Sequence, residues 1–205
     1  MITLYDYWRS TASYRVRITL GLAGLEWQSI PVDLVAGEQS SDAHLDRNPQ
    51  GLVPVLDIDG QRFTQSIAIV EYLNETRSLG LLPPDAEGRA RVRMLAYMIA
   101  MDLHPVCNLR VAKYAVAHSN GGLTMQSWMQ AHITPALLAL EDMLEGGDFC
   151  FGETLSIADI CLLPQLYNAH RWGVTLDAMP KIKRIEDNLS TIPAFAAAHP
   201  DQIVH

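Results

Sequence analysis

Cysteine is scarce in this chain, and recognisable metal-binding patterns are missing. The 205 residues include three cysteines with no CxxC pair, and seven histidines that form no HxxxH or HExxH pattern. A disulfide framework, a structural zinc site and a metal hydrolase site are therefore all poorly supported. The glycine-rich pattern GxGxxG and the P-loop pattern are missing as well, which argues against nucleotide-dependent enzymes. The chemistry of this chain must use another cofactor, or none.

The sequence also has few positively charged residues and no long apolar runs. There are 15 Lys and Arg residues against 23 Asp and Glu residues, which leaves a net charge of −8. This balance argues against nucleic acids and anionic membranes as partners, because both require a cationic surface. No apolar stretch approaches the about 18 residues of a membrane span, and the first residues lack a signal peptide's basic-then-apolar order. We therefore expect a soluble, cytoplasmic protein.

The first eighty residues alternate between strand-like and helix-like segments. Apolar runs predict strands at 2–5 and 27–34, and the segment 14–23 predicts an amphipathic helix in which Arg15 and Arg17 form the polar side. Further along, Asp59-Gly60 lies between two strand-like runs, which is typical of a β-hairpin. The order β-α-β, then a hairpin, then a helix opened by Ser66 predicts a thioredoxin-like domain.

The remainder of the chain has helical patterns after a proline-rich break. Helices are predicted at 87–116 (bent or interrupted at Pro105), 124–145, 154–167, 181–189 and 194–198. Ser156 and Asp159 have the spacing of a capping box. The fold class is therefore α/β plus all-α, with a thioredoxin-like domain over 1–81, a linker over 82–85 and an all-helical domain over 86–205.

Three local patterns in the first domain could carry chemistry. Val53-Pro54 comes just before a strand, and is either an ordinary strand-initiating proline or a cis peptide that turns the Val53 backbone outward for a peptide to pair with. Gln65-Ser66 begins a helix, where N–H groups and a hydroxyl can bind a carboxylate. Ser10 and Thr11 begin the first helix, where hydroxyl and N–H groups can stabilise a thiolate. A peptide site, a carboxylate site and a thiolate site together suit glutathione, a tripeptide with a central thiol and a carboxylate at each end.

Longer segments carry a family resemblance. They are 7–17 (YWRSTASYRVR), 48–56 (NPQGLVPVL), 65–73 (QSIAIVEYL), 102–110 (DLHPVCNLR) and 155–159 (LSIAD). These segments, spread over nearly the whole chain, resemble the zeta class of glutathione transferases, the family of maleylacetoacetate and maleylpyruvate isomerases. The resemblance implies a glutathione transferase fold, glutathione as the cofactor, a small dicarboxylate as the substrate and a homodimer.

The resemblance also implies roles for individual residues. Ser10, Thr11 and Arg9 correspond to catalytic positions, and Arg9, Arg110 and Arg171 to positions that bind substrate carboxylates, which arginine can grip with two hydrogen bonds. The implied glutathione-binding residues are Ser10, Thr11, Gln39, Val53, Pro54, Gln65, Ser66, Asp102, His104, Asn108 and Arg110. Asp102 and His104 would act from the neighbouring subunit of the dimer.

One departure from the family pattern bears on the activity. Zeta enzymes usually have Ser-Ser-Cys in the first loop, whereas this chain has Ser10-Thr11-Ala12. The missing cysteine argues against reductive dehalogenation, but isomerisation needs only the glutathione thiolate. The expected reaction is the conversion of maleylacetoacetate to fumarylacetoacetate by thiolate addition, C–C rotation and thiolate elimination. The alternatives are isomerisation of maleylpyruvate in gentisate breakdown, conjugation or dehalogenation of small α-halo acids, and a non-catalytic glutathione-binding role.

Overall fold

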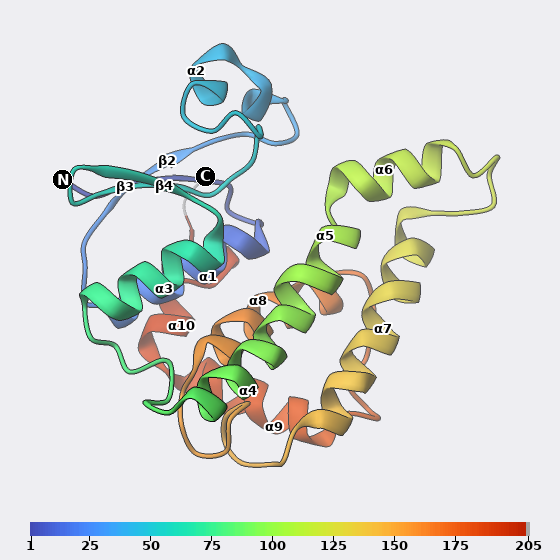
Figure 1. Cartoon of the computed structure of the whole chain (residues 1–205). Coiled ribbons are helices and arrows are strands. Elements are labelled where there is room, and N and C mark those ends of the chain that lie inside the picture. Colours follow the sequence, from blue (N-terminus) through green and yellow to red (C-terminus); the bar gives the residue numbers. More distant parts are fainter. Residues whose placement is uncertain (204–205) are drawn as a thin grey trace. The chain divides into compact units, whose positions relative to one another are not determined.

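The chain forms two compact units. In the computed structural model, which describes residues 1–203, the first unit contains Met1–Gly80 together with the segment that begins at Ile192, and the second contains Leu81–Thr191 (Figure 1). The predicted division assigned everything after residue 86 to the helical domain. The structure differs at the C-terminal end, where the last segment packs with the first unit.

A four-stranded mixed sheet forms the first unit's centre, with strand order β2-β1-β3-β4. β1 (Thr3–Asp6) pairs in parallel with β2 (Gln28–Pro31), and β3 (Val55–Ile58) pairs antiparallel with both β1 and β4 (Gln61–Thr64). With α1 (Thr11–Leu22) and α3 (Ser66–Thr76), this is the thioredoxin-like order that the sequence predicts. Between β1 and β3, two further short helical segments, η1 (Glu38–Ser40) and α2 (Asp42–Leu45), were not predicted.

Helix α1 is buried on both of its faces, which corrects the expectation of an amphipathic helix. Val16 and Leu20 pack into the apolar core beside the sheet, and contribute to a cluster with Leu56 and Ile69. Arg15 and Arg17 are both 1% exposed. Two guanidinium groups are therefore held inside the first unit, where each needs hydrogen-bond acceptors to offset the loss of water.

The C-terminal segment joins the first unit through helix α1. α10 (Pro193–Ala197) packs on α1, where the Tyr14 hydroxyl donates to the Phe195 carbonyl at 3.3 Å. Arg17 Nε donates to the Ala198 carbonyl at 3.2 Å, before η3 (Pro200–Gln202) ends the described chain. Gly21 permits this approach, because a Cβ placed there would lie 3.2 Å from that of Ala194. These contacts explain why the segment belongs to the first unit.

The second unit begins with a nearly continuous helical run. It comprises α4 (Ala86–Tyr97), the π-helical η2 (Met98–Leu103), α5 (His104–Val106) and α6 (Leu109–Ala117). The predicted interruption at Pro105 is displaced by two residues, to Cys107-Asn108, where Asn108 caps α6. Pro105 itself lies within the helical run, in α5, which directly follows η2.

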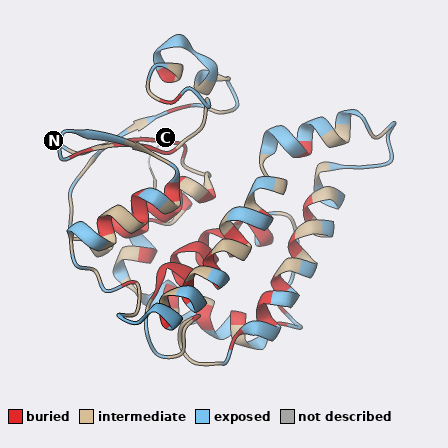
Figure 2. Ribbon diagram, in the orientation of Figure 1, coloured by how far each residue is buried: buried red, intermediate tan, exposed pale blue. Residues whose placement is uncertain are grey.

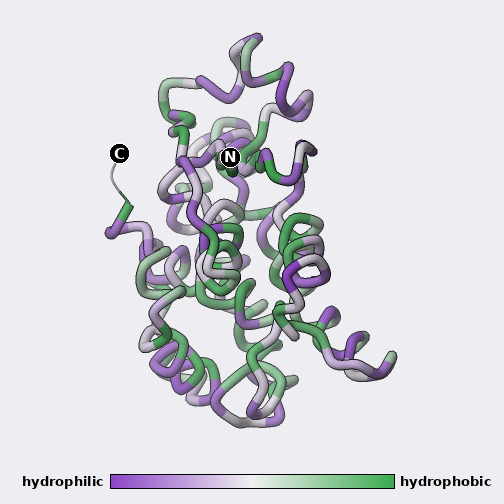
Figure 3. The backbone as a smooth tube through the Cα atoms, turned by 90° about the vertical axis from the view of Figure 1, so that its left-hand side faces the viewer, coloured by the Kyte–Doolittle hydropathy of each residue, from purple (hydrophilic) through white to green (hydrophobic). Residues whose placement is uncertain are grey.

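Helix α8 (Ile157–Arg171) forms the core of the second unit. It contacts α4, η2, α7 (Met125–Met143) and α9 (Pro180–Thr191), and it is mostly buried in Figure 2. The predicted capping interaction is present, since the Asp159 carboxylate accepts from the Ser156 N–H at 2.8 Å. Hydrophobic and hydrophilic residues alternate in short stretches along the helices (Figure 3), as expected where one face packs inward. Within residues 1–203, no helix combines the length and the apolar character needed to cross a membrane.

Candidate active site

The loop between β1 and α1 presents Ser10 at the start of a buried helix. Ser10 is the N-cap of α1, and its Oγ accepts a hydrogen bond from the Ser13 N–H at 3.2 Å. The Ser10 N–H donates to the Tyr7 carbonyl at 2.8 Å, which closes the loop on itself. The cap uses Ser10 Oγ as an acceptor, so its O–H group can still donate. An anion beside this helix end would gain that hydrogen bond and the positive end of the helix dipole.

Arg9 extends from the same loop and is held by aromatic rings. Its Nη2 donates to the Tyr7 hydroxyl at 3.0 Å, and its guanidinium carbon lies 4.4 Å from the centre of the Trp8 ring. The buried Nε of Arg9 has no hydrogen-bond partner among residues 1–203. This preorganised cation with a spare donor is suited to binding a carboxylate.

A cavity of about 490 Å³ lies beside this loop. It is lined by Asp6, Tyr7, Trp8, Arg9, Ser29, Pro31, Val32, Asp33, Val35, Glu38 and Ile203. The carboxylates of Asp33 and Glu38 are occupied locally: Asp33 accepts from Val35 N at 2.7 Å, and Glu38 from Asp33 N at 2.7 Å. Arg9 supplies positive charge to a lining that also contains the carboxylates of Asp6, Asp33 and Glu38.

The segment before β3 has an unpaired stretch of backbone. The Val53-Pro54 peptide is cis, which resolves the two alternatives left open by the sequence. Among the described residues, the backbone N–H and C=O of Val53 have no hydrogen-bond partner. The preceding Leu52 carbonyl, by contrast, accepts a hydrogen bond from Asn48 Nδ2 at 2.9 Å and lies 3.0 Å from His44 Nε2. An extended peptide could pair with Val53 as an added strand.

The start of α3 presents groups that can bind an anion. Gln65, the N-cap, has φ of 69°, a left-handed conformation that is rare for a residue with a side chain and is found at functional sites. Ser66 is the first residue of the helix and is 7% exposed. The first N–H groups of a helix lack intrahelical acceptors, so they can bind a carboxylate together with the Ser66 hydroxyl.

Nearby side chains add further polar groups in the first unit. Gln65 Nε2 donates to Gln50 Oε1 at 2.8 Å, so the Gln65 side chain is held by a residue that was not among the predicted site residues. Gln39, in η1, has a buried Oε1 without a partner among the described residues. A ligand with amide and ammonium donors would satisfy it. The donors and acceptors left open by Val53, Gln39, Ser66 and Ser10 fit the peptide, carboxylate and thiol groups of glutathione.

The remaining predicted site residues belong to the second unit. Asp102 lies in η2 and is exposed, and His104 begins α5. Asn108 caps α6, because its Oδ1 accepts from the Arg110 N–H at 3.0 Å. Arg171 is the last residue of α8, with its guanidinium carbon 5.7 Å from the centre of the Trp172 ring. The structure thus places four of these residues on one stretch and Arg171 at the end of a different helix.

The chain's own thiols are unsuited to nucleophilic attack. The three cysteines have free thiols and are buried: Cys107, Cys150 and Cys161. Burial raises the pKa of the Cys107 thiol to about 11, and burial together with the Asp159 carboxylate raises the pKa of Cys150 well above its usual value. These buried thiols are poor nucleophiles, so a thiol supplied by a bound molecule is better suited to attack.

Alkylation tests this conclusion directly. We expect treatment with iodoacetamide at pH 7.5 to leave catalytic activity unchanged, because a thiol with a pKa of about 11 is almost entirely protonated at that pH. Intact-protein mass spectrometry before and after treatment gives the extent of modification. Rapid alkylation accompanied by loss of activity would contradict the prediction.

The fold and the site together define a class of protein. This chain has a thioredoxin-like sheet, helix N-termini at α1 and α3 that are suited to binding anions, and an all-helical second unit. That is the architecture of the glutathione transferases. The models of the glutathione S-transferase N-terminal and C-terminal domains match residues 1–75 and 87–188.

Individual relatives narrow this class. Maleylacetoacetate isomerase of Rhizobium meliloti is 53% identical over 204 residues, which cover 97% of this chain and 96% of that protein. The enzyme of the same name from Rattus norvegicus is 42% identical over 202 residues, covering 96% of this chain and 91% of that protein. The chain belongs to the maleylacetoacetate isomerase family, the zeta class of the glutathione transferases.

Solved structures agree with this assignment. The holo structure of a bacterial zeta-class maleylpyruvate isomerase has a TM-score of 0.93 and 36% identity, with 98% of each chain covered. Maleylacetoacetate isomerase from Anaeromyxobacter dehalogenans, with glutathione bound in its active site, has a TM-score of 0.88 and 40% identity, covering 99% of this chain and 96% of that chain. The predicted family and fold class are confirmed.

Proposed function

We propose that this chain is a glutathione-dependent cis–trans isomerase that converts maleylacetoacetate to fumarylacetoacetate. One observation carries the proposal: the first unit has a hydroxyl at the start of α1, an unpaired backbone residue before β3 and an anion site at the start of α3. These features match the thiol, the peptide backbone and a terminal carboxylate of glutathione. The names of the most similar relatives supply the substrate, and Arg9 supplies a cation suited to a dicarboxylate.

Each part of the site has a proposed role in holding glutathione. Val53 pairs with the tripeptide backbone beside Pro54, and Gln39, Gln65 and Ser66 bind its polar ends. Ser10, supported by Thr11, donates its hydroxyl hydrogen to the sulfur. From the second unit, we assign Asp102, His104, Asn108 and Arg110 to glutathione binding by their resemblance to the family's positions. The first unit is thus the glutathione-binding domain, and the second contributes substrate-binding residues.

Several side chains of this protein are proposed to stabilise the negative charges that the reaction involves. When bound, glutathione supplies a thiolate that adds reversibly to the cis double bond, which permits rotation about the resulting C–C single bond. Ser10 and the helix N-terminus stabilise the anionic sulfur before attack. Arg9 stabilises the negative charge of the substrate, and Arg110 and Arg171 are assigned to its carboxylates.

A second candidate substrate is maleylpyruvate. The zeta-class maleylpyruvate isomerase matches this chain with a TM-score of 0.93. Both substrates are cis-enediones with two carboxylates, so the same thiolate and arginines would serve either one. Conjugation of small α-halo acids would use the same groups as a side activity.

The deciding experiment is an ultraviolet absorbance assay with freshly prepared maleylacetoacetate and maleylpyruvate, each with and without glutathione. We expect glutathione-dependent conversion to the fumaryl isomer, with a higher kcat/KM for maleylacetoacetate. A higher kcat/KM for maleylpyruvate would assign the second candidate. If neither substrate is converted while calorimetry shows that glutathione binds, the isomerase proposal is wrong.

The substrate arginines can be tested separately. Replacing Arg9 or Arg171 with methionine is expected to raise the KM for the dicarboxylate by about 10–100-fold, because each substitution removes charge-assisted hydrogen bonds. The steady-state kinetics of Arg184→Met provide the control, since Arg184 is exposed and paired with Asp148 at 2.7 Å. Wild-type KM values in both variants would place the carboxylate site elsewhere.

Assembly and location complete the proposal. We propose a cytoplasmic homodimer, and exposed apolar side chains in the second unit support association: Met94 is 48% and Met101 is 57% exposed. Sedimentation equilibrium at micromolar concentration should give twice the 22.7 kDa mass of one chain. A monomer mass across the concentration range would contradict it.

A further inference from the structure

A buried arginine lies directly beneath the anion site at the start of α3. Arg15, on α1, is 1% exposed, and its Nη1 lies 3.3 Å from Ser66 Oγ. α1 and α3 pack side by side (Figure 1), so this contact links the two helices at the point where α3 begins. Arg15 was predicted only to lie on a helix and was not among the predicted binding residues.

The direction of this hydrogen bond determines what the Ser66 hydroxyl can do. A guanidinium group has N–H donors and no acceptor, so Ser66 Oγ must accept from Arg15. The hydroxyl hydrogen of Ser66 then remains for an acceptor other than Arg15. A serine without such a neighbour can rotate its hydroxyl to accept or to donate, whereas this one is biased toward donating.

The positive charge of Arg15 also favours binding of an anion at the start of α3. The guanidinium stays protonated inside proteins, so Arg15 places a full positive charge beside the positive end of the α3 dipole. Screening by water is weaker for a buried charge than for an exposed one, and its attraction for a nearby anion is correspondingly stronger. Hydrogen-bond direction and charge therefore both favour a carboxylate over a neutral amide at this helix end.

We infer that Arg15 is a positioning residue for carboxylate recognition: it orients the Ser66 hydroxyl as a donor and supplies buried positive charge for the α-carboxylate of the glutathione γ-glutamyl group. Arg15 acts through Ser66 and need not touch the ligand. The inference rests on the proposed function, because it names the device by which the proposed glutathione site distinguishes a carboxylate from its uncharged analogue.

The test compares two ligands on the intact protein by isothermal titration calorimetry. One ligand is glutathione, and the other is glutathione whose γ-glutamyl α-carboxylate is replaced by a carboxamide. We expect the wild-type protein to bind glutathione more tightly than the amide. In Arg15→Met this preference should fall by about tenfold, through loss of affinity for glutathione with little change for the amide. A role confined to packing α1 against α3 would weaken both ligands equally.

Further variants separate the contributions. Arg15→Lys keeps a positive charge and should retain part of the preference, and it serves as the main test if Arg15→Met does not fold. In a Ser66→Ala background, Arg15→Met should reduce the preference by less than it does alone, because the hydroxyl that Arg15 orients is gone. Arg77→Gln is the control: it removes one positive charge from the other end of α3, where Arg77 pairs with Asp59 on the surface, and should leave the preference unchanged.

The possible results have distinct meanings. If the wild-type protein does not bind glutathione, the proposed function itself is wrong. If it binds glutathione in preference to the amide, and the folded Arg15 variants keep the full wild-type preference, the inference about Arg15 is overturned while the proposed function stands. An equal loss of affinity for both ligands would also overturn it, in favour of a packing role.

Discussion

Replacing Ser10 with alanine is expected to lower the kcat for isomerisation by about 10²–10³-fold, the usual effect of removing one donor to a catalytic anion. The expectation follows from the position of Ser10, whose O–H is free to donate at the N-terminus of α1 while its oxygen accepts from Ser13 N at 3.2 Å. Without the hydroxyl, the pKa of the bound glutathione thiol should rise. The ultraviolet absorbance of the thiolate as a function of pH measures that shift.

Two further variants separate this role from helix capping. Ser10→Ala also removes the cap, which costs about 1 kcal/mol of stability. Ser10→Asp keeps a capping oxygen but places a negative charge beside the sulfur, so it should be stable and nearly inactive. Ser13→Ala is the matched control, because the buried Ser13 hydroxyl has no hydrogen-bond partner among the described residues. Wild-type turnover in Ser10→Ala would refute the assignment of Ser10 as the thiolate donor.

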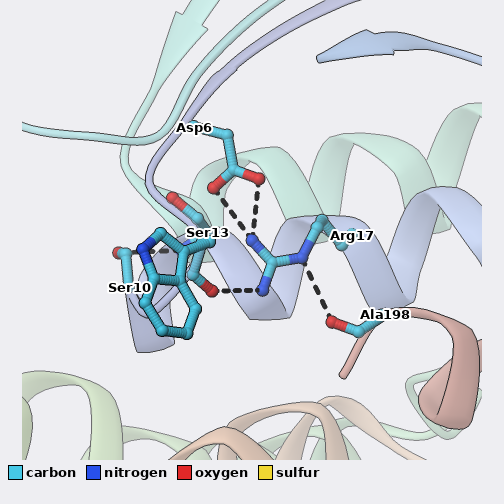
Figure 4. A network of polar contacts seen from close by, with 6 residues as sticks. Asp6, Ser10, Ser13, Arg17 and Ala198 are labelled. Carbon is cyan, nitrogen blue, oxygen red and sulfur yellow. Dashed lines mark hydrogen bonds and ion pairs between the residues drawn. The ribbon is translucent and has the colours of Figure 1, made fainter. Parts of the chain in front are cut away.

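Replacing Arg17 with methionine is expected to reduce the free energy of unfolding by about 3–5 kcal/mol, because it leaves the partner carboxylate buried without a counter-charge. Arg17 Nη1 contacts the two oxygens of Asp6 at 2.9 and 2.7 Å, and both side chains are at most 2% exposed (Figure 4). Arg17 Nη2 donates to the Trp8 carbonyl at 2.9 Å, and Nε to the Ala198 carbonyl at 3.2 Å. One side chain thus joins β1, the Ser10 loop and the C-terminal segment.

Urea titration followed by tryptophan fluorescence measures this loss. The double variant Asp6→Leu with Arg17→Met should recover part of the stability, because it removes the uncompensated charge but leaves two carbonyls without their donor. Arg62→Met is the control: Arg62 pairs with Asp57 at 2.6 Å but is 43% exposed, and loss of such a surface pair costs at most about 1 kcal/mol. Equal stability of Arg17→Met and Arg62→Met would show that the buried pair contributes no more than a surface one.

Several elements could be predicted because their causes are local. Asp59 and Gly60 have φ of 53° and 75°, the left-handed conformations that a two-residue hairpin turn requires, and this residue pair is typical of such turns. Ser66 begins α3, and Asp159 reaches back to Ser156, as their spacing indicates. In each case the residues that determine the structure are close together in the chain.

The boundaries were less predictable where two local signals compete. The apolar pattern alone predicts the first helix over 14–23, whereas the hydroxyl residues Ser10 and Thr11 indicate an earlier start. The helix begins at Thr11 with Ser10 as its N-cap, so the capping signal is the one that holds. The helix was expected to bend or be interrupted at Pro105, but the helical run continues from η2 through Pro105 in α5. The break falls instead where Asn108 caps the next helix.

The thioredoxin-like order of elements, the helical second unit and the helix starts at Ser10 and Ser66 could all be predicted, because periodicity, turns and caps depend on neighbouring residues. The burial of Arg15 and Arg17 and the return of the segment after Ile192 to α1 could not be predicted and are known from the fold. The fold also leaves the backbone of Val53 unpaired within the described chain. Burial and hydrogen bonding depend on which distant segment packs against a residue. For α1, that segment is far away in the sequence: Arg17 donates to the carbonyl of Ala198, 181 positions further along the chain.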